Sequence, residues 1–170
     1  MPDMLVKLYE LPDVSSLIGT LKERGIVIRT AMPYEKHIVT HWVRRTFGRA
    51  WESECEVAFS NHPVSCFLAT EASEVIGFAC YDSTCLNFFG PTGVEKSKRG
   101  LGIGKALFLS CLYAMRAKGF AYAIVGSTGL TEFYAKAAGA IAIEGSKPGI
   151  YRDQLKEDNH EANTRSEATQ

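Results

Sequence analysis

Three glycines at alternate positions constrain the fold of this chain more than any other feature. Gly100, Gly102 and Gly104 stand between a strand-like stretch, Leu86 to Val94, and a helix-like stretch ending near Lys118. Glycine lets a backbone approach a ligand closely and adopt conformations that other residues resist. Free amides at a helix start favour an anion. The sequence therefore predicts a turn that binds pyrophosphate.

The spacing separates this turn from two other phosphate-binding loops. In a Walker loop, Gly-Lys is followed by Ser or Thr, whereas Gly104-Lys105 is followed by Ala106, and Arg99 replaces the first glycine. A dinucleotide-binding GxGxxG motif would need a glycine at Lys105 or Leu107. The pattern that remains is Arg-x-x-Gly-x-Gly.

The rest of the chain predicts one mixed sheet with flanking helices. Strands are expected at 26–29, 66–70, 75–81, 86–94, 121–125 and 140–143, with a last short strand near 150–151. Helices are expected at 13–25, 33–47, 51–59, 102–118 and 131–138. The strand at 86–94 contains Gly90, Pro91 and Gly93, so it should be broken or splayed near its end.

Three segments follow from these elements and from composition. Residues 1–25 form an N-terminal extension packed on the domain, residues 26–153 form the domain itself, and the polar composition of residues 154–170 predicts a disordered tail. Nineteen basic residues balance nineteen acidic ones, which argues against nucleic acid or a membrane as partner. We expect one domain in the cytoplasm, because neither a signal peptide nor a membrane-spanning run is visible.

Five cysteines show no spacing typical of a metal site. They are expected to be buried, reduced thiols, and no metal is predicted. His37 and His41 lie one helical turn apart, a spacing that could hold a metal, but no third ligand is visible. The cysteines are Cys55, Cys66, Cys80, Cys85 and Cys111.

Two blocks of the sequence resemble the GNAT superfamily of N-acetyltransferases. The stretch from Val94 to Gly104 is similar to the acyl-CoA pyrophosphate loop V-x-P-x-x-R-G-x-G-I-G, with Lys96 in place of proline. The stretch 133–140 is similar to F-Y-x-K-x-G-F, with one more residue before the glycine, and Ser127 stands where the family has asparagine. The resemblance implies an α/β fold: a single mixed, mostly antiparallel sheet of six to seven strands with a splayed central pair and about four helices.

The resemblance also implies a co-substrate and a site. Acetyl-CoA would bind through the turn and through the main chain of the splayed strand, and Tyr134 would be the general acid that protonates the leaving thiolate. Tyr134 could instead simply pack on the sheet beside Phe133. The residues implied for cofactor binding are Thr92, Gly93, Val94, Arg99, Gly100, Leu101, Gly102, Ile103, Gly104 and Lys105.

The general base and the acceptor stay open at this stage. Candidates for the base are Asp82, Glu71, His37 and His41, none of them in a position where the family places a glutamate. The two N-terminal helices and the loop 147–150 should select the acceptor. Aromatic side chains on that side are either core or cavity wall: Tyr34, Trp42, Trp51 and Phe59. Residues 88–91 could form a narrow apolar channel.

The expected function is acetyl transfer from acetyl-CoA to a primary amine of a small metabolite, by direct attack in a ternary complex. A protein or peptide N-acetyltransferase and a non-catalytic acyl-CoA sensor are the alternatives. A homodimer is an expectation from family habit.

Overall fold

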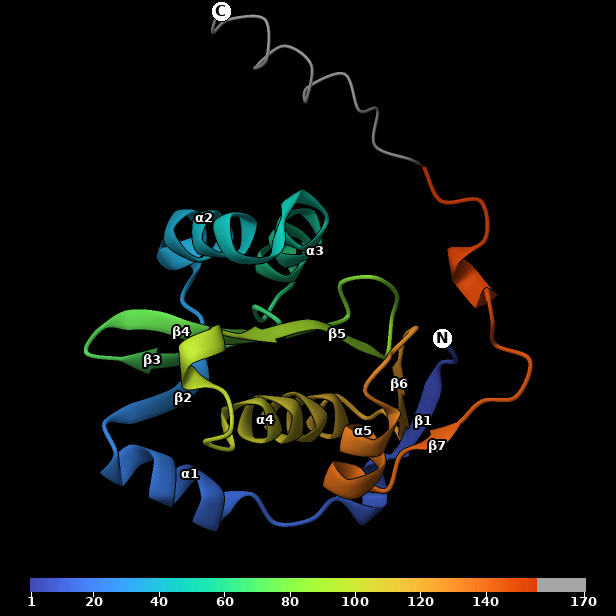
Figure 1. Ribbon diagram of the computed structural model, residues 1–170, viewed down its shortest axis with the longest axis horizontal. Coiled ribbons are helices and arrows are strands. Elements are labelled where there is room, and N and C mark those ends of the chain that lie inside the picture. The colour runs from blue at the N-terminus through green and yellow to red at the C-terminus, as the bar shows by residue number, and fades with distance from the viewer. Residues whose placement is uncertain (156–170) are drawn as a thin grey trace, which may run out of the picture.

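The computed structural model describes residues 1–155, which form one sheet covered by helices on both faces (Figure 1). Across the sheet the strands lie in the order β2-β3-β4-β5-β6-β1-β7. All neighbours are antiparallel except β5 and β6. The predicted mixed, mostly antiparallel sheet is therefore confirmed. Its strands are β1 (Met4–Lys7), β2 (Ile26–Thr30), β3 (Cys66–Glu71), β4 (Glu74–Tyr81), β5 (Phe88–Val94), β6 (Tyr122–Val125) and β7 (Ile141–Ala142).

Five α-helices occur in the described residues, at the five stretches that the sequence pattern predicts, where the family resemblance implied about four. Figure 1 shows α2 and α3 on one face of the sheet and α1, α4 and α5 on the other. The two layers have separate cores, one around Val43 and Phe78 under α2 and α3, the other around Leu107 and Leu112 of α4. The helices are α1 (Ser15–Glu23), α2 (Lys36–Phe47), α3 (Arg49–Ser60), α4 (Ile103–Ala117) and α5 (Thr131–Ala138).

The central pair of strands is splayed. Strand β5 pairs with β4 as far as Val94, which lies opposite Gly77. On its other edge β5 pairs with β6 only at Phe88 and Phe89. The backbone of β5 from Gly90 onward therefore has an edge that β6 does not cover. This open edge lies next to the turn that leads into α4, so the interruption by glycine and proline positions the site.

The N-terminal strand lies inside the sheet. Met4–Lys7 pairs with both β6 and β7, and the carboxylate of Asp3 accepts a hydrogen bond from the amide of Ser127 at 2.7 Å. The division of the chain at residues 25 and 153 stays a prediction. The predicted tail falls almost entirely on residues 156–170, outside those that the structure describes.

One predicted strand is wrong. Residues 149–151 form a single 3₁₀ turn rather than a strand near Ile150 and Tyr151. Two apolar residues are too few to specify a strand when no neighbouring strand pairs with them. None of the helices found in residues 1–155 has the length and sustained hydropathy of a membrane-spanning segment.

Candidate active site

The glycine turn has the backbone geometry that the sequence indicates. Gly100 and Gly102 have φ values of +84° and +88°, a left-handed region that favours glycine. Helix α4 begins directly after Gly102, and the first amides of an α-helix have no acceptor within the helix. The Arg99 Nε donates a hydrogen bond to the carbonyl oxygen of Val94 at 3.2 Å, which ties the turn to the end of β5. The turn thus offers free amides at a helix N-terminus, where an anion is stabilised.

A cavity of about 640 Å³ runs from this turn along the open edge of β5. Every residue predicted to bind the cofactor lines it except Leu101, whose side chain is exposed. Tyr134 lies at one end, and Phe47 and Phe108 contribute apolar wall. Lys98 forms an ion pair with Glu71, so Lys98 is already partnered. The cavity therefore joins an anion-binding end to an apolar end.

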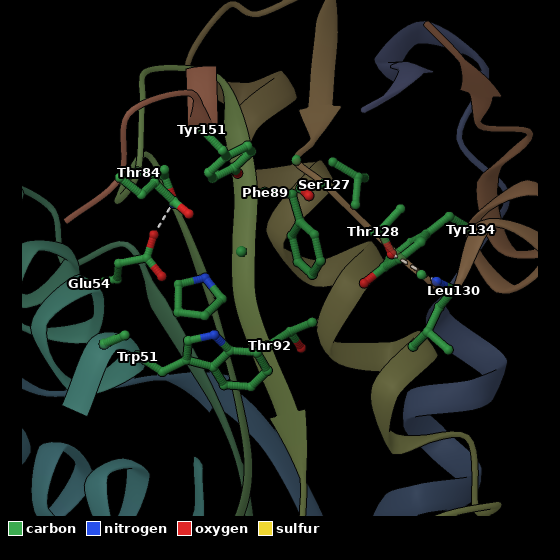
Figure 2. Close-up of a pocket in the computed structure, with 17 residues that line it drawn as sticks. Trp51, Glu54, Thr84, Phe89, Thr92, Ser127, Thr128, Leu130, Tyr134 and Tyr151 are labelled. Atoms are coloured by element: carbon green, nitrogen blue, oxygen red, sulfur yellow. Dashed lines mark hydrogen bonds between the residues drawn. The ribbon is translucent and has the colours of Figure 1, made fainter. Parts of the chain in front are cut away.

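A second cavity of about 610 Å³ adjoins the first. The two share four lining residues: Trp51, Thr92, Leu130 and Tyr134. In Figure 2, Trp51 and Glu54 lie on one side of the cavity, and Thr128, Leu130 and Tyr134 lie on the other. A molecule bound in either cavity can reach the shared wall.

Tyr134 is buried at this shared wall. Its ring packs edge-on against Phe108, with ring centroids 4.9 Å apart, and against Phe89 at 6.1 Å. Burial raises the pKa of Tyr134 to about 12, although a hydrogen bond with Thr128 acts in the opposite direction. The phenol therefore keeps its proton at neutral pH.

Glu54 is the one charged side chain among the described residues that line the second cavity. It lies on α3 one helical turn after Trp51 and accepts a hydrogen bond from the hydroxyl of Thr84 (Figure 2). Its negative charge is close enough to Tyr151 to help burial raise the pKa of that phenol to about 12. Glu54 was not among the candidates for the base. Its spacing from Trp51 is the sequence signal that could have found it, because residues three apart lie on the same helix face and Trp51 was a candidate for the cavity wall.

None of the four predicted candidates for the base lines either cavity. Asp82 is buried and pairs with Lys118 at 2.6 Å, and Glu71 pairs with Lys98. His37 and His41 are exposed on α2. Asp82 and Glu71 are held in ion pairs away from both cavities, whereas Glu54 lines the second cavity.

The aromatic residues divide between core and site. Trp42 and Phe59 are buried under α2 and α3, Tyr34 is exposed, and Trp51 alone of these four lines the cavities. Of residues 88–91, the last three line the second cavity, and a narrow apolar channel there stays a prediction.

The loop expected to select the acceptor lies beside the second cavity but does not line it. Residues 147–150 do not line either cavity, whereas Tyr151 does. A Cβ on Gly126 would lie 2.2 Å from the Tyr151 hydroxyl, so this close approach requires glycine. The sequence carries no local signal for such a contact, since the two residues lie far apart in the chain.

The model of the acetyltransferase (GNAT) family matches residues 36–140. This span is more than half of the 170 residues and contains the glycine turn, the whole of β5 and Tyr134. The chain therefore belongs to the acetyltransferase (GNAT) family, and the predicted resemblance is confirmed. Members of this family use acetyl-CoA. No curated protein matches the sequence.

Solved structures of low identity share the fold. The GCN5-related glucosamine N-acetyltransferase region of a fungal multi-domain GH3 β-N-acetylglucosaminidase has a TM-score of 0.68 and 16% identity, over 84% of this chain and 19% of that one. A GCN5-related N-acetyltransferase from Sphaerobacter thermophilus has a TM-score of 0.66 and 22% identity, over 84% and 48%. A GNAT acetyltransferase from Colwellia psychrerythraea has a TM-score of 0.59 and 13% identity, over 83% and 52%. This chain spans about half or less of each.

Proposed function

We propose that this chain transfers the acetyl group of acetyl-CoA to a primary amine of a small molecule, by direct attack in a ternary complex. The observation that carries the proposal is the junction of two cavities at Tyr134, one beside the glycine turn and one containing a single carboxylate. Two substrates bound in these cavities meet at the shared wall, and such positioning lowers the barrier of a bimolecular reaction.

The first cavity, which contains the glycine turn, suits the donor. Amides of residues 100–105 would bind the pyrophosphate, and Arg99 would brace the turn through its bond to Val94. The pantetheine arm would lie along Thr92, Gly93 and Val94, where β5 has an edge not covered by β6. The thioester would then reach the buried end of the cavity next to Tyr134.

The second cavity suits a cationic acceptor. Glu54 supplies one negative charge, and Trp51, Phe89 and Tyr151 supply aromatic wall. A primary ammonium group is stabilised both by a carboxylate and by the face of an aromatic ring. We therefore assign the acceptor to compact amines rather than to anionic molecules.

The chemistry needs two protons removed from the acceptor nitrogen and one donated to the leaving sulfur. Glu54, directly or through a water molecule, takes a proton from the ammonium group, and the free amine nitrogen attacks the thioester carbon. The tetrahedral intermediate collapses as the carbon–sulfur bond breaks, and Tyr134 donates its proton to the leaving sulfur. The acylated nitrogen gives up its second proton, directly or through a water molecule, to the Tyr134 phenolate, which restores the phenol. The products are the acetylated amine and CoA.

The test combines binding with turnover. Acetyl-CoA at a hundred times its dissociation constant should stabilise the fold by about 2.7 kcal/mol in a thermal shift, whereas NAD should not. Thiol release from acetyl-CoA, measured across a panel of amines, should then depend on the amine. Stabilisation without amine-dependent release would favour a sensor or a protein substrate. No stabilisation would contradict the donor assignment.

A matched pair of variants tests the acceptor assignment. Glu54→Gln keeps the shape and the hydrogen bond from Thr84 but removes the charge and the base, so amine-dependent turnover should fall about 10²-fold or more. Stabilisation by acetyl-CoA should remain. Glu56→Gln, on the exposed side of the same helix, should leave turnover unchanged. Equal rates for Glu54→Gln and wild type would remove Glu54 from the mechanism.

We also propose that the protein acts in the cytoplasm. All five cysteines are free thiols, and Cys85 is exposed. Free thiols are typical of a reducing compartment. The homodimer stays a prediction.

A further inference from the structure

Three buried cysteines from three different elements meet beneath α3. Cys55 lies on α3, and Cys66 and Cys80 face each other across the β3–β4 ladder. Each is fully buried, and the three sulfur atoms all lie within 4.8 Å of one another. The spacing of these cysteines in the sequence does not predict the cluster, because one helix and two strands contribute one residue each.

The surroundings of the three thiols are apolar. Val43, Ala58 and Phe78 belong to the same buried cluster. The sulfur of Cys66 donates a long hydrogen bond, 3.8 Å, to the carbonyl oxygen of Phe67. Among the described residues, no His, Asp or Glu joins the group. The cluster therefore offers soft sulfur ligands in a site where oxygen and nitrogen side-chain ligands are missing.

We propose that Cys55, Cys66 and Cys80 bind a thiophilic divalent metal ion, of the class of zinc and cadmium, through three thiolates. Sulfur ligands of one tetrahedral zinc lie about 3.8 Å apart, since each Zn–S bond is about 2.3 Å. The three sulfurs therefore need to move by only about 1 Å. Soft thiolates favour such ions over magnesium or calcium.

Charge selects a divalent ion. Binding releases three protons, one from each thiol, so a divalent ion leaves the complex with one net negative charge. A monovalent ion with three thiolates would leave two negative charges in an apolar interior, where unpaired charge is costly.

The bound ion would join the α3 layer to the sheet. Cys55 follows Glu54 directly, and Trp51 lies one turn earlier on the same helix. An ion shared by α3, β3 and β4 would therefore hold one wall of the second cavity in place. Metal binding itself is independent of the proposed acetyl transfer, because the cluster lines neither cavity.

The test measures metal retained after folding. Because the three thiols are fully buried, the ion has to enter as the chain folds. The full chain is unfolded in guanidinium under reducing conditions, refolded with zinc or cadmium, and desalted before elemental analysis. We expect one metal ion per wild-type chain, thiolate-to-cadmium charge-transfer absorption, and a raised melting temperature.

Controls use the cysteines outside the cluster. Cys111→Ala removes another fully buried thiol, and Cys85→Ser removes the exposed one. Both should retain one ion, whereas Cys66→Ala and Cys55→Ala should retain at least ten-fold less. Wild-type protein that retains no more metal than Cys66→Ala would overturn the proposal.

A second measurement does not depend on the folding of any variant. X-ray absorption at the zinc edge of the refolded wild-type protein counts the ligand atoms. Three sulfur neighbours would support the site, and a shell of nitrogen and oxygen alone would overturn it.

Discussion

At the scale of single residues, burial sets the properties of Tyr134, the proposed general acid. Its phenol is nearly inaccessible to solvent yet lines both cavities, and burial raises its pKa to about 12. General acids work best when the pKa lies near the operating pH. A phenol this weak as an acid should therefore contribute at the lower end of the usual range.

We expect Tyr134→Phe to lower kcat about 10²-fold while the stabilisation by acetyl-CoA is kept. The ring would retain its contacts with Phe89 and Phe108, and only the proton donor is lost. Steady-state thiol release with a saturating amine measures the effect. Tyr113→Phe is the control, because the Tyr113 hydroxyl bonds the Pro12 carbonyl outside both cavities. An unchanged kcat for Tyr134→Phe would reduce Tyr134 to a packing residue.

At the scale of elements, the site depends on how α2 closes over β5. The ring of Phe47, the last residue of α2, lies directly over Gly93 on β5. A Cβ on Gly93 would come within 2.4 to 2.8 Å of three ring carbons. Phe47 also lines the first cavity, so the packing of α2 on β5 shapes the proposed donor site.

We predict that Gly93→Ala destabilises the fold by about 1–3 kcal/mol, the usual cost of overpacking, and weakens the stabilisation by acetyl-CoA. Denaturant unfolding measures the first effect and thermal shift the second. Gly19→Ala should have the opposite sign, about 0.5–1 kcal/mol of stabilisation, because Gly19 lies within α1 with nothing within 4 Å of the added carbon. A Gly93→Ala protein as stable as wild type would contradict this account of the packing.

At the scale of the whole molecule, three tyrosines should make the folded state less stable at alkaline pH. Burial is the main cause that raises the pKa of Tyr81, Tyr134 and Tyr151 to about 12. An unfolded tyrosine has a pKa of about 10. Between these values the unfolded chain loses protons that the folded chain retains, which favours unfolding.

The free energy of unfolding should therefore be constant with respect to these groups below about pH 10 and should fall between about pH 10 and 12. The loss from Tyr134 is at most about 2.7 kcal/mol. Tyr81 is buried as well, whereas Tyr151 is only half-buried and contributes less because solvent screens it. Denaturant titrations at a series of pH values measure the slope. Tyr134→Phe should make the fall of the unfolding free energy with pH less steep. An equally steep fall in that variant would contradict the assignment.

Local signals in the sequence determined most of the elements. The hairpin of β3 and β4 follows from two short apolar stretches joined by a tight turn. Helix α4 follows from its start after alternate glycines, and the break in β5 follows from Gly90 and Pro91. These features depend on residues that are neighbours in the chain. The glycine turn and Tyr134 could be singled out from the sequence for the same reason, because each lies in a contiguous motif.

Only the tertiary structure decided which distant residues meet. Glu54 with Thr84, Tyr151 over Gly126, and the three clustered cysteines are contacts between separate elements. Burial and contact depend on how α3, the strands and the 149–151 turn pack, and packing is set by the whole chain. A residue's own neighbours in sequence therefore carry no record of the charge, ring or thiol that lies beside it in the fold.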